Sequence, residues 1–362
     1  MRVAIGLRLA VDDWEAASTY VVEAERLGVD FVWSAEAWGH DAATPLAFLA
    51  GRTSRIRLGT GVMQVGTRSP ALVAMTAMSL AAMSEGRFAL GLGVSGPQVI
   101  EGWHGVPFER PVRRLRETVE IVRAALRGQR LVYRGHVYKI PLAAEGKALQ
   151  SSARPQPGVP IYVAALTPHG LETAGEIADG WLGLSFMPEH RHVFLDHLET
   201  GAARAGRSLA DLDLQAGGTV ACTDDLERLL PPLKFALAYS LGAMGSSRRN
   251  FYNDAVRRAG YEDAALEVQR LWLQARWREA ARRVPDELVL KTNLLGSDAM
   301  VRRRLEAYAA AGITTLRVDP AGETLDARLA TLGRLLDLVR ERREPASQPA
   351  ALALTGTVPA RT

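Results

Sequence analysis

The sequence predicts a single (β/α)8 barrel, an α/β fold of the TIM-barrel type. Eight short apolar segments have the length of buried strands, and amphipathic helical patterns lie between them. The chain has 362 residues, 48% of them hydrophobic, so it can bury one large core. Strict alternation of strand and helix favours parallel strands with right-handed crossovers, and eight such units close into a barrel. The expected strands are 2–8, 30–35, 56–63, 87–94, 160–166, 180–186, 213–222 and 313–319.

The helical segments carry recognisable start signals. The first helix is expected over 13–27, where Asp12 and Glu15 have the spacing of a capping box. Another is expected over 111–127, with its apolar residues on one face. These residues are Leu115, Val119, Val122 and Leu126. Three further starts place a capping hydroxyl before a proline that suits the first helical position. They are Thr44-Pro45, Ser69-Pro70 and Thr167-Pro168.

Two segments exceed a bare strand-and-helix unit and are expected to be insertions in a barrel that spans residues 1–342. The first, about 128–158, contains a hairpin-like pattern followed by a Ser/Pro-rich stretch. The second, about 223–300, carries extra helices, including one at 264–283 that is either helical cover, a dimer face or a substrate lid. Residues 343–362 are rich in Pro, Ala, Thr and Ser and are expected to be a disordered tail.

Composition excludes several classes of protein. The single cysteine, Cys222, cannot form an intramolecular disulfide, and neither a signal peptide nor an apolar run long enough for a membrane span is visible. We therefore expect a cytoplasmic protein with no membrane partner. The net charge of +4 comes mostly from arginines in helical patterns without interleaved aromatic residues, so no nucleic-acid partner is expected.

Three motif-like patterns are interpreted as structural. Gly91, Gly93 and Gly96 spell GxGxxG with Glu117 about twenty residues on, but Pro97 and a loop replace the helix that a dinucleotide site needs. The histidines at 190, 192 and 197 lack a metal-binding spacing, so no metal is expected. Ser95 lies in Gly93-Val94-Ser95-Gly96, which is not the G-x-S-x-G elbow of a serine hydrolase.

The loop at 164–167 is the strongest candidate for a binding site. It follows an apolar strand, its small side chains let a ligand approach the backbone N–H groups, and it leads into a helix start. A helix N-terminus with exposed N–H groups binds phosphate well. Ordinary capping by Thr167 is the alternative.

Several segments together resemble the luciferase-like superfamily, in the branch that depends on the deazaflavin coenzyme F420 and includes methylene-tetrahydromethanopterin reductase. The resemblance runs from about residue 20 to residue 340. The segments that carry it are LGTGV at 58–62, RSP at 68–70, LGLGVSGPQ at 90–98, EGWHG at 101–105, AALTP at 164–168, GEIADG at 175–180, NFYND at 250–254 and VPDEL at 284–288.

The resemblance implies a cofactor site at three loops. The third strand is expected to end in a bulge with a non-prolyl cis peptide at Gly61 and Val62, behind the deazaflavin ring. The loop after the fourth strand would hold the edge of the ring, and the loop after the fifth would hold the phosphate. The residues implied in these two loops are Val94, Ser95, Gly96, Pro97, Gln98 and Val99, and Ala164, Ala165, Leu166 and Thr167. Tail carboxylates are expected near basic residues such as Arg68 or Arg110.

The chain departs from the family at the proton donor. Some relatives carry a glutamate just after the fourth strand, where this sequence has Gly96. Glu36, at an acidic position of the family, and His40 are therefore the candidate catalytic residues, with a solvated loop role as the alternative. Trp38, Trp103 and Tyr252 are candidates to line a substrate pocket, or are core residues.

The resemblance implies hydride transfer between the deazaflavin and a small organic substrate, in a reductase or dehydrogenase that reduces a C=C or C=N bond. One alternative is an FMN-dependent monooxygenase on the same fold. Another is a barrel that binds a ligand without catalysis. A homodimer is expected, because barrels of this family usually pair and the segment 264–283 carries aromatic residues that look exposed.

Overall fold

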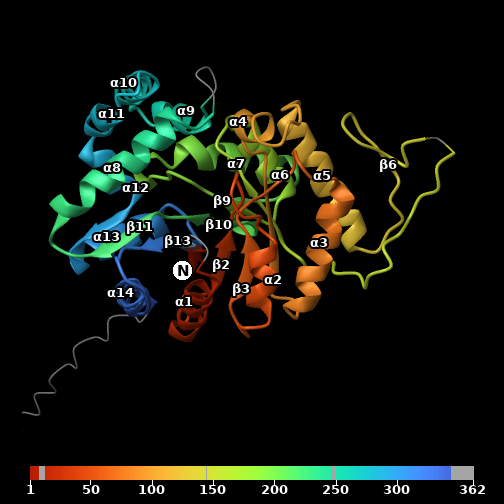
Figure 1. Ribbon diagram of the computed structural model, residues 1–362, viewed down its shortest axis with the longest axis horizontal. Helices are drawn as coiled ribbons and strands as arrows, with labels where there is room; N and C mark the ends of the chain where they lie inside the picture. The colour runs from red at the N-terminus through yellow and green to blue at the C-terminus, as the bar shows by residue number, and fades with distance from the viewer. Residues whose placement is uncertain (8–12, 144, 246–249, 344–362) are drawn as a thin grey trace, which may run out of the picture.

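Eight parallel strands close into a barrel in the computed structural model, which describes residues 1–7, 13–143, 145–245 and 250–343 (Figure 1). The last barrel strand pairs back with the first. Each expected strand overlaps one strand of the barrel, so the predicted fold is confirmed. In order around the barrel they are β1 (Arg2–Gly6), β2 (Phe31–Ser34), β3 (Arg57–Thr60), β5 (Phe88–Gly93), β8 (Ile161–Ala164), β9 (Gly180–Leu182), β10 (Asp213–Ala216) and β13 (Thr315–Pro320).

One expected strand, 213–222, is two strands in the structure. The chain turns at Gly217 and Gly218, where a Cβ atom would lie 2.2 Å from the backbone oxygen of Arg317 or 2.3 Å from that of Thr292. Only glycine fits such a close backbone approach. The second part, β11 (Thr219–Cys222), pairs with β13 and with β12 (Leu294–Gly296). A short strand, β4 (Met63–Gln64), likewise follows β3 and pairs with β5.

Helices pack around the outside of the barrel and bury the apolar face of each strand. The predicted helix over 111–127 is confirmed, and its four named apolar residues are buried. The outer helices are α1 (Trp14–Leu27), α2 (Thr44–Ala50), α3 (Pro70–Met83), α5 (Pro111–Leu126), α6 (Pro168–Ile177), α7 (His192–Arg204), α13 (Asp298–Ala310) and α14 (Leu325–Arg343), with 3-10 turns at Pro188–His190 and Leu209–Asp211.

The helix starts were predicted unevenly. Ser69 and Thr167 cap α3 and α6 through their hydroxyl oxygens, as expected. Thr44 does not cap α2; the side chain of Asp41 accepts the N–H groups of Ala43 and Thr44 instead, so that prediction is wrong. The capping box is also wrong, because Asp13 caps α1, while Asp12 lies outside the described residues.

The interior of the barrel is filled by a separate apolar cluster. Phe31 stacks on Trp33 at 5.5 Å between ring centroids, and Tyr162 meets Trp33 edge-on at 5.1 Å. At the amino end of the strands, the carboxylate of Asp213 accepts hydrogen bonds from Tyr162 and Thr315, both at 2.8 Å. The cluster closes the barrel from below, so the barrel opens only where the strands end. It comprises Ala4, Phe31, Trp33, Ala89, Tyr162 and Leu182.

Both expected insertions contain elements outside the barrel. The described residues of 128–158 form an arm that projects from the barrel and contains the predicted hairpin, β6 (Tyr133–Arg134) and β7 (Lys139–Ile140) (Figure 1). The described residues of 226–292 form a helical cluster beside the barrel mouth, in which α10 and α11 pack on α8. Its helices are α8 (Leu226–Gly242), α9 (Phe251–Arg258), α10 (Glu262–Leu273), α11 (Trp277–Arg283) and α12 (Asp286–Thr292). Across the described part of the chain, no helix has the length and apolar character needed to cross a membrane. The expected tail, apart from Arg343 at the end of α14, lies outside the described residues.

Candidate active site

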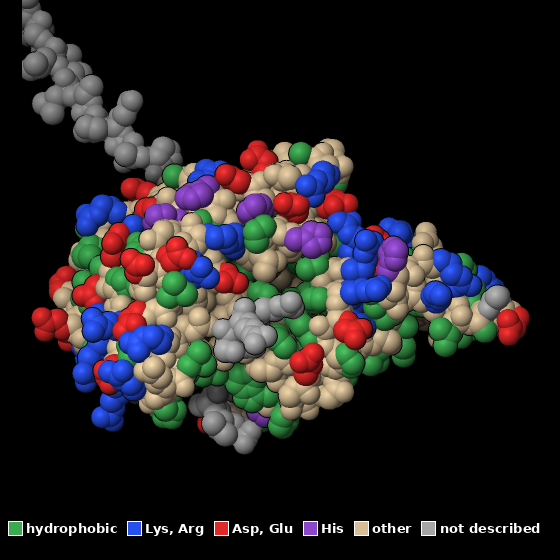
Figure 2. Space-filling view, turned by 90° about the horizontal axis from the view of Figure 1, so that it is seen from above, with side chains coloured by type: hydrophobic (Ala, Val, Ile, Leu, Met, Phe, Trp, Pro, Cys, Tyr) green, Lys and Arg blue, Asp and Glu red, His purple; other side chains and the backbone are tan. Residues whose placement is uncertain are grey.

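A cavity of about 880 Å³ opens at the carboxyl ends of the barrel strands. Seen from this side, apolar side chains surround a hollow, with Lys and Arg side chains along one edge (Figure 2). Trp33 forms part of its lining and is fixed by a hydrogen bond from its Nε1 to the Oε1 of Gln215 at 3.0 Å. The carboxyl end of a barrel is where enzymes of this architecture place their active sites, and this cavity is the candidate.

One wall of the cavity is lined by residues that the sequence analysis expected to bind a cofactor. Eleven of the twelve residues assigned to cofactor binding border the cavity, and the exception is Pro97, the first residue of the short helix α4 (Pro97–Ile100). The peptide bond between Gly61 and Val62 is cis, as expected. The eleven are Gly61, Val62, Val94, Ser95, Gly96, Gln98, Val99, Ala164, Ala165, Leu166 and Thr167.

The glycines of β5 let the end of β3 pack closely against it. A Cβ atom on Gly91 would lie 1.9 Å from the backbone oxygen of Thr60, and one on Gly93 would lie 2.6 Å from a methyl group of Val62. The GxGxxG pattern therefore has a packing explanation, and α4, with four residues, is not a dinucleotide-binding helix. Glu117 holds the arm at 128–158, because its buried carboxylate accepts hydrogen bonds from the backbone N–H groups of residues 136–138. Burial alone would raise the pKa of Glu117, but these hydrogen bonds lower it.

The loop at 164–167 presents N–H groups for an anion. The carbonyl oxygen of Ala165 accepts from Trp181 Nε1 at 3.0 Å, and that of Leu166 accepts from Arg258. Neither donor side chain borders the cavity. In a trans peptide the N–H points opposite to the carbonyl, so the N–H groups of Leu166 and Thr167 point away from these donors, to the cavity side. Neither N–H has an acceptor among the residues that the structure describes.

The start of α6 completes this anion site. The hydroxyl oxygen of Thr167 accepts from the N–H of Gly170 at 3.2 Å, and both residues border the cavity. A helix of ten residues whose first turn faces a cavity adds the positive end of its dipole. The arrangement suits a phosphate group.

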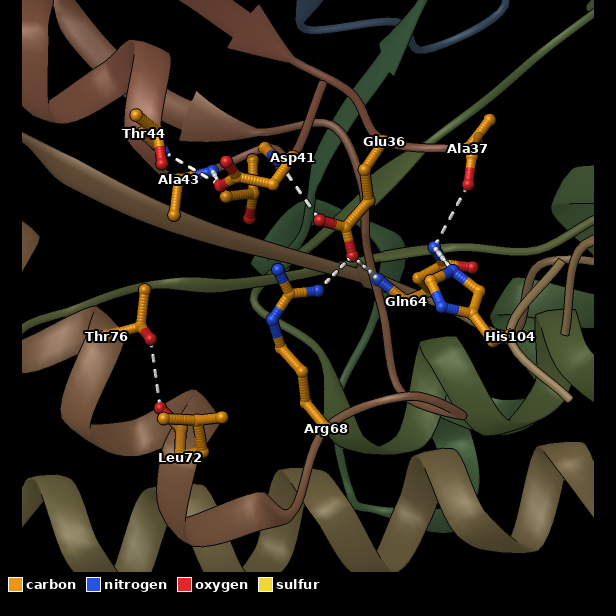
Figure 3. Close-up of polar contacts among 12 residues, drawn as sticks. Glu36, Ala37, Asp41, Ala43, Thr44, Gln64, Arg68, Leu72, Thr76 and His104 are labelled. Carbon is orange, nitrogen blue, oxygen red and sulfur yellow. Dashed lines mark hydrogen bonds and ion pairs between the residues drawn. The ribbon is translucent and has the colours of Figure 1, made fainter. Parts of the chain in front are cut away.

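Glu36 borders the cavity at the centre of a polar cluster (Figure 3). Its side chain is 4% exposed and forms an ion pair with Arg68. One carboxylate oxygen also accepts the N–H of Gln64 at 2.9 Å, and the other accepts the N–H of Ala42 at 3.1 Å. Glu36 thus joins the loop after β2 to β4 and to the start of α3.

Gln64 extends the cluster toward the loop that follows α4. Its Nε2 donates to the carbonyl oxygen of Ala37 at 3.3 Å and lies 3.1 Å from Nε2 of His104 (Figure 3). The buried Oε1 atoms of Gln64 and Gln98 have no hydrogen-bond partner in the described part of the chain, and both residues border the cavity. Such buried oxygens are available to a ligand that donates hydrogen bonds.

Other predicted site residues are placed differently. His40 is exposed, with its ring edge-on to Trp14 at 5.1 Å, and does not border the cavity. Trp38 borders the cavity, whereas Trp103 is 64% exposed outside it. Arg68 and Arg110 do not border it either.

The sequence reasoning missed the cover of the cavity and the charge inside it. Residues of α8 and the start of α9 form the cover, while the segment expected at 264–283 packs behind α8 and does not reach the cavity. Arg317, on β13, borders the cavity and was not singled out. A charged residue inside an apolar strand was the available signal, since buried arginines are rare without a role.

The histidines near α7 form no metal site in the described part of the chain. The rings of His190 and His192 lie 6.3 Å apart, and Lys291 Nζ lies 3.4 Å from Nε2 of His190. Burial and the charges of Lys291 and His192 lower the pKa of His190, although Glu189 and Glu287 act in the other direction.

Known proteins resemble this chain in sequence and in fold. The family described as luciferase-like monooxygenase matches residues 1–315. A candidate coenzyme F420-dependent oxidoreductase of Mycobacterium tuberculosis is 41% identical over 307 residues, which are 82% of this chain and 88% of that protein. The 5,10-methylenetetrahydromethanopterin reductase of Archaeoglobus fulgidus is 29% identical, over 82% and 86% of the two chains. The solved structure of the coenzyme F420-dependent tetrahydromethanopterin reductase from Methanopyrus kandleri superposes with a TM-score of 0.76 at 24% identity, over 92% and 98% of the chains.

Proposed function

The chain belongs to the luciferase-like monooxygenase family, and from this premise we propose that it is an oxidoreductase that uses coenzyme F420. The observation that carries the proposal is the cavity wall on which the bulge after β3 and the loops after β5 and β8 meet. The 41% identity to a candidate F420-dependent oxidoreductase supports the choice of cofactor.

The wall fits a flat ring followed by a phosphate. Gly61, Val62 and Gly93 leave a surface without large side chains, against which a ring can lie. The unpaired Oε1 of Gln98 borders the same wall and can accept a hydrogen bond from the edge of a ring. The N–H groups of Leu166 and Thr167 and the start of α6 suit the phosphate.

When bound, the deazaflavin would supply a carbon that donates or accepts hydride. The protein's own contribution is position and environment. Leu233, Leu237 and Met244 border the cavity from the α8 side and exclude water from it. Trp33 closes the cavity from below, so a substrate enters from the mouth and meets the open face of the ring.

The proton step is assigned to Glu36 or His40. Glu36 is the better placed, because it borders the cavity whereas His40 does not. Both oxygens of Glu36 already accept hydrogen bonds, so its part also includes holding Gln64 and Arg68 in place. The role of either residue in proton transfer stays a prediction.

We further propose reduction of a C=C or C=N bond in a small organic substrate. A deazaflavin reacts poorly with oxygen because carbon replaces the reactive ring nitrogen, which favours a reductase over an oxygenase. The rival function is an FMN-dependent monooxygenase, since FMN also carries a ring and a phosphate and the fold does not decide the chemistry.

Turnover in air and under argon tests the proposal against this rival. Reduced F420 and a panel of enones and imines are mixed with the protein, and oxidation of the coenzyme is followed by its absorbance. We expect oxidation that requires the acceptor and proceeds at the same rate without oxygen. Turnover with reduced FMN that needs oxygen, and none with reduced F420, would overturn it.

We propose that the protein is a cytoplasmic homodimer that pairs through α3. This helix has no charged residue over its fourteen positions, and Leu72, Met75 and Met83 are 47%, 58% and 54% exposed. A helix that is apolar on all sides is normally covered. In the segment 264–283, expected from the sequence to form the dimer face, Trp272 packs on Phe235 and Trp277, while Trp277 itself is 51% exposed, so that face stays a second prediction.

A further inference from the structure

The cavity has a second wall, which the proposed cofactor does not use. The strand order places β10, β13 and β1 across the barrel from β3, β5 and β8. The cofactor loops all follow β3, β5 and β8. Whatever reacts with the cofactor must therefore lie against the opposite wall, which β13 and the inserted helices α8 and α9 provide.

Arg317 is the cation of this wall, and Asp319, two residues further along β13, also borders the cavity. Arg317 borders the cavity, and its Nη2 donates to the carbonyl oxygen of Gly183 at 3.2 Å. Among the described residues, no carboxylate forms an ion pair with it. Asp319, the next residue on the same face of β13, is itself engaged in an interaction. Burial lowers the pKa of Arg317 to about 10, so it remains a cation at neutral pH.

Tyr252 lies beside this cation at the start of α9. It borders the cavity, and its hydroxyl has no hydrogen-bond partner within the described part of the chain. Burial raises its pKa, so the phenol is a neutral donor at neutral pH, although the charge of Arg317 acts in the other direction. Asn250, whose Nδ2 donates to the carbonyl oxygens of Ser240 and Leu241 at 3.0 Å and 2.9 Å, fixes the start of the helix.

Apolar side chains face these two donors from the inserted helices and from the end of β1. Leu233, Leu237 and Phe251 border the cavity from α8 and α9, and Leu7 borders it from β1. A ligand that lies on this side therefore meets one cation and one phenol, with apolar side chains over it and the carboxylate of Asp319 further along β13. A half-buried cation without an ion pair favours a partner of opposite charge.

We propose that Arg317 and Tyr252 bind a carboxylate of the substrate, whose apolar body lies under α8. One guanidinium and one neutral phenol match a single negative charge and two acceptor oxygens. A phosphate dianion would be better served by the N–H groups at the start of α6, on the other wall. The inference deepens the proposed function, on which it rests for the place of the cofactor, and it makes the substrate class an apolar carboxylic acid.

Matched acids and amides test the site without turnover. Octanoate and octanamide, which differ in charge but hardly in shape, are titrated by calorimetry into the protein with and without F420. The variants are Arg317→Gln, Arg317→Lys and Tyr252→Phe, and the control is Arg207→Gln. Arg207 does not border the cavity, and in the described part of the chain its side chain donates only to the carbonyl oxygens of Ala178 and Asp211. Arg207→Gln therefore removes one positive charge, as Arg317→Gln does, without changing the cavity.

The wild-type protein and the Arg207→Gln control should bind octanoate about tenfold or more tightly than octanamide, because the bonds are charge-assisted. Arg317→Gln should abolish this preference, Arg317→Lys should retain part of it, and Tyr252→Phe should reduce it by about threefold. The melting temperature of each variant verifies that it is folded. If Arg317→Gln does not fold, the effect of Tyr252→Phe on the preference for octanoate tests the inference instead.

Equal binding of acid and amide by the wild-type protein, or a preference that survives both Arg317→Gln and Tyr252→Phe, would overturn the inference. The arm without F420 separates it from the proposed function. If that arm behaves as stated and F420 does not bind, the carboxylate site stands and the cofactor assignment fails.

Discussion

Replacing Glu36 by glutamine should weaken both the fold and the reaction. Glutamine keeps the size of the side chain and one acceptor oxygen, so it loses the ion pair with Arg68 and one of two backbone N–H bonds. A bond to a charged group contributes about 1.5–3 kcal/mol. Arg68 is 20% exposed and keeps some hydration, so the larger cost of a fully buried unpaired charge does not apply. We expect a loss of about 2 kcal/mol, or a melting temperature lower by about 3 °C.

Thermal unfolding gives the melting temperature of the variant and steady-state kinetics give its turnover, so together they test this prediction. Glu15→Gln is the control, since Glu15 is 83% exposed and its contact with Arg52 at 3.9 Å contributes little. The double variant Glu36→Gln with Arg68→Gln should lose less stability than the sum of the single variants, because both remove the same pair. Turnover should fall more than F420 affinity. A melting temperature and a turnover that both match the Glu15→Gln control would refute the reasoning.

Four further predictions follow from the structure. His40→Ala should lower turnover without changing F420 affinity if His40 handles the proton, and unchanged turnover removes it from the mechanism. Thr167→Asp should weaken F420 binding about tenfold or more in a fluorescence titration, by placing a negative charge at the phosphate, and unchanged affinity would contradict the site. Asp213→Asn should lower the melting temperature at pH 7. Burial alone would raise the pKa of Asp213, but its hydrogen bonds and the charge of Arg2 lower it. The stability that the ionised carboxylate contributes is therefore present above about pH 4 and is lost at lower pH. The difference in melting temperature between Asp213→Asn and the wild type should disappear at this low pH. Met75→Glu should give a monomeric mass in light scattering while Leu142→Glu, 84% exposed on the arm, leaves a dimer; a wild-type monomer would contradict the pairing through α3.

The barrel was predictable because each strand carries its own apolar signal and the alternation with helices is regular. Helix starts were less predictable: Ser69 and Thr167 cap as expected, but Asp41 replaces Thr44 because its side chain reaches two backbone N–H groups from a preceding turn. The division of 213–222 depends on Gly217 and its approach to β13. A contact with a strand about a hundred residues away leaves no local pattern.

The meeting of the bulge after β3 with the loops after β5 and β8 around one cavity was predictable from the resemblance, and the capping of α6 by Thr167 was also predictable from the helix start. The opposite wall was not predictable, because it consists of β13 and an insertion. The packing of that insertion on the barrel leaves no periodic pattern in the sequence. Tyr252 was a candidate only as an aromatic residue, and Arg317 stood among apolar neighbours without a motif. Their meeting in one cavity is a result of the fold.

The central claim is the choice of cofactor, and an equilibrium titration of F420 against FMN tests it most directly. The fluorescence of each cofactor is followed while protein is added, at low and at high salt. The account predicts tighter binding of F420, weakening as salt rises, because its tail carries carboxylates that FMN lacks. Tighter binding of FMN, with no effect of salt on F420, would contradict it.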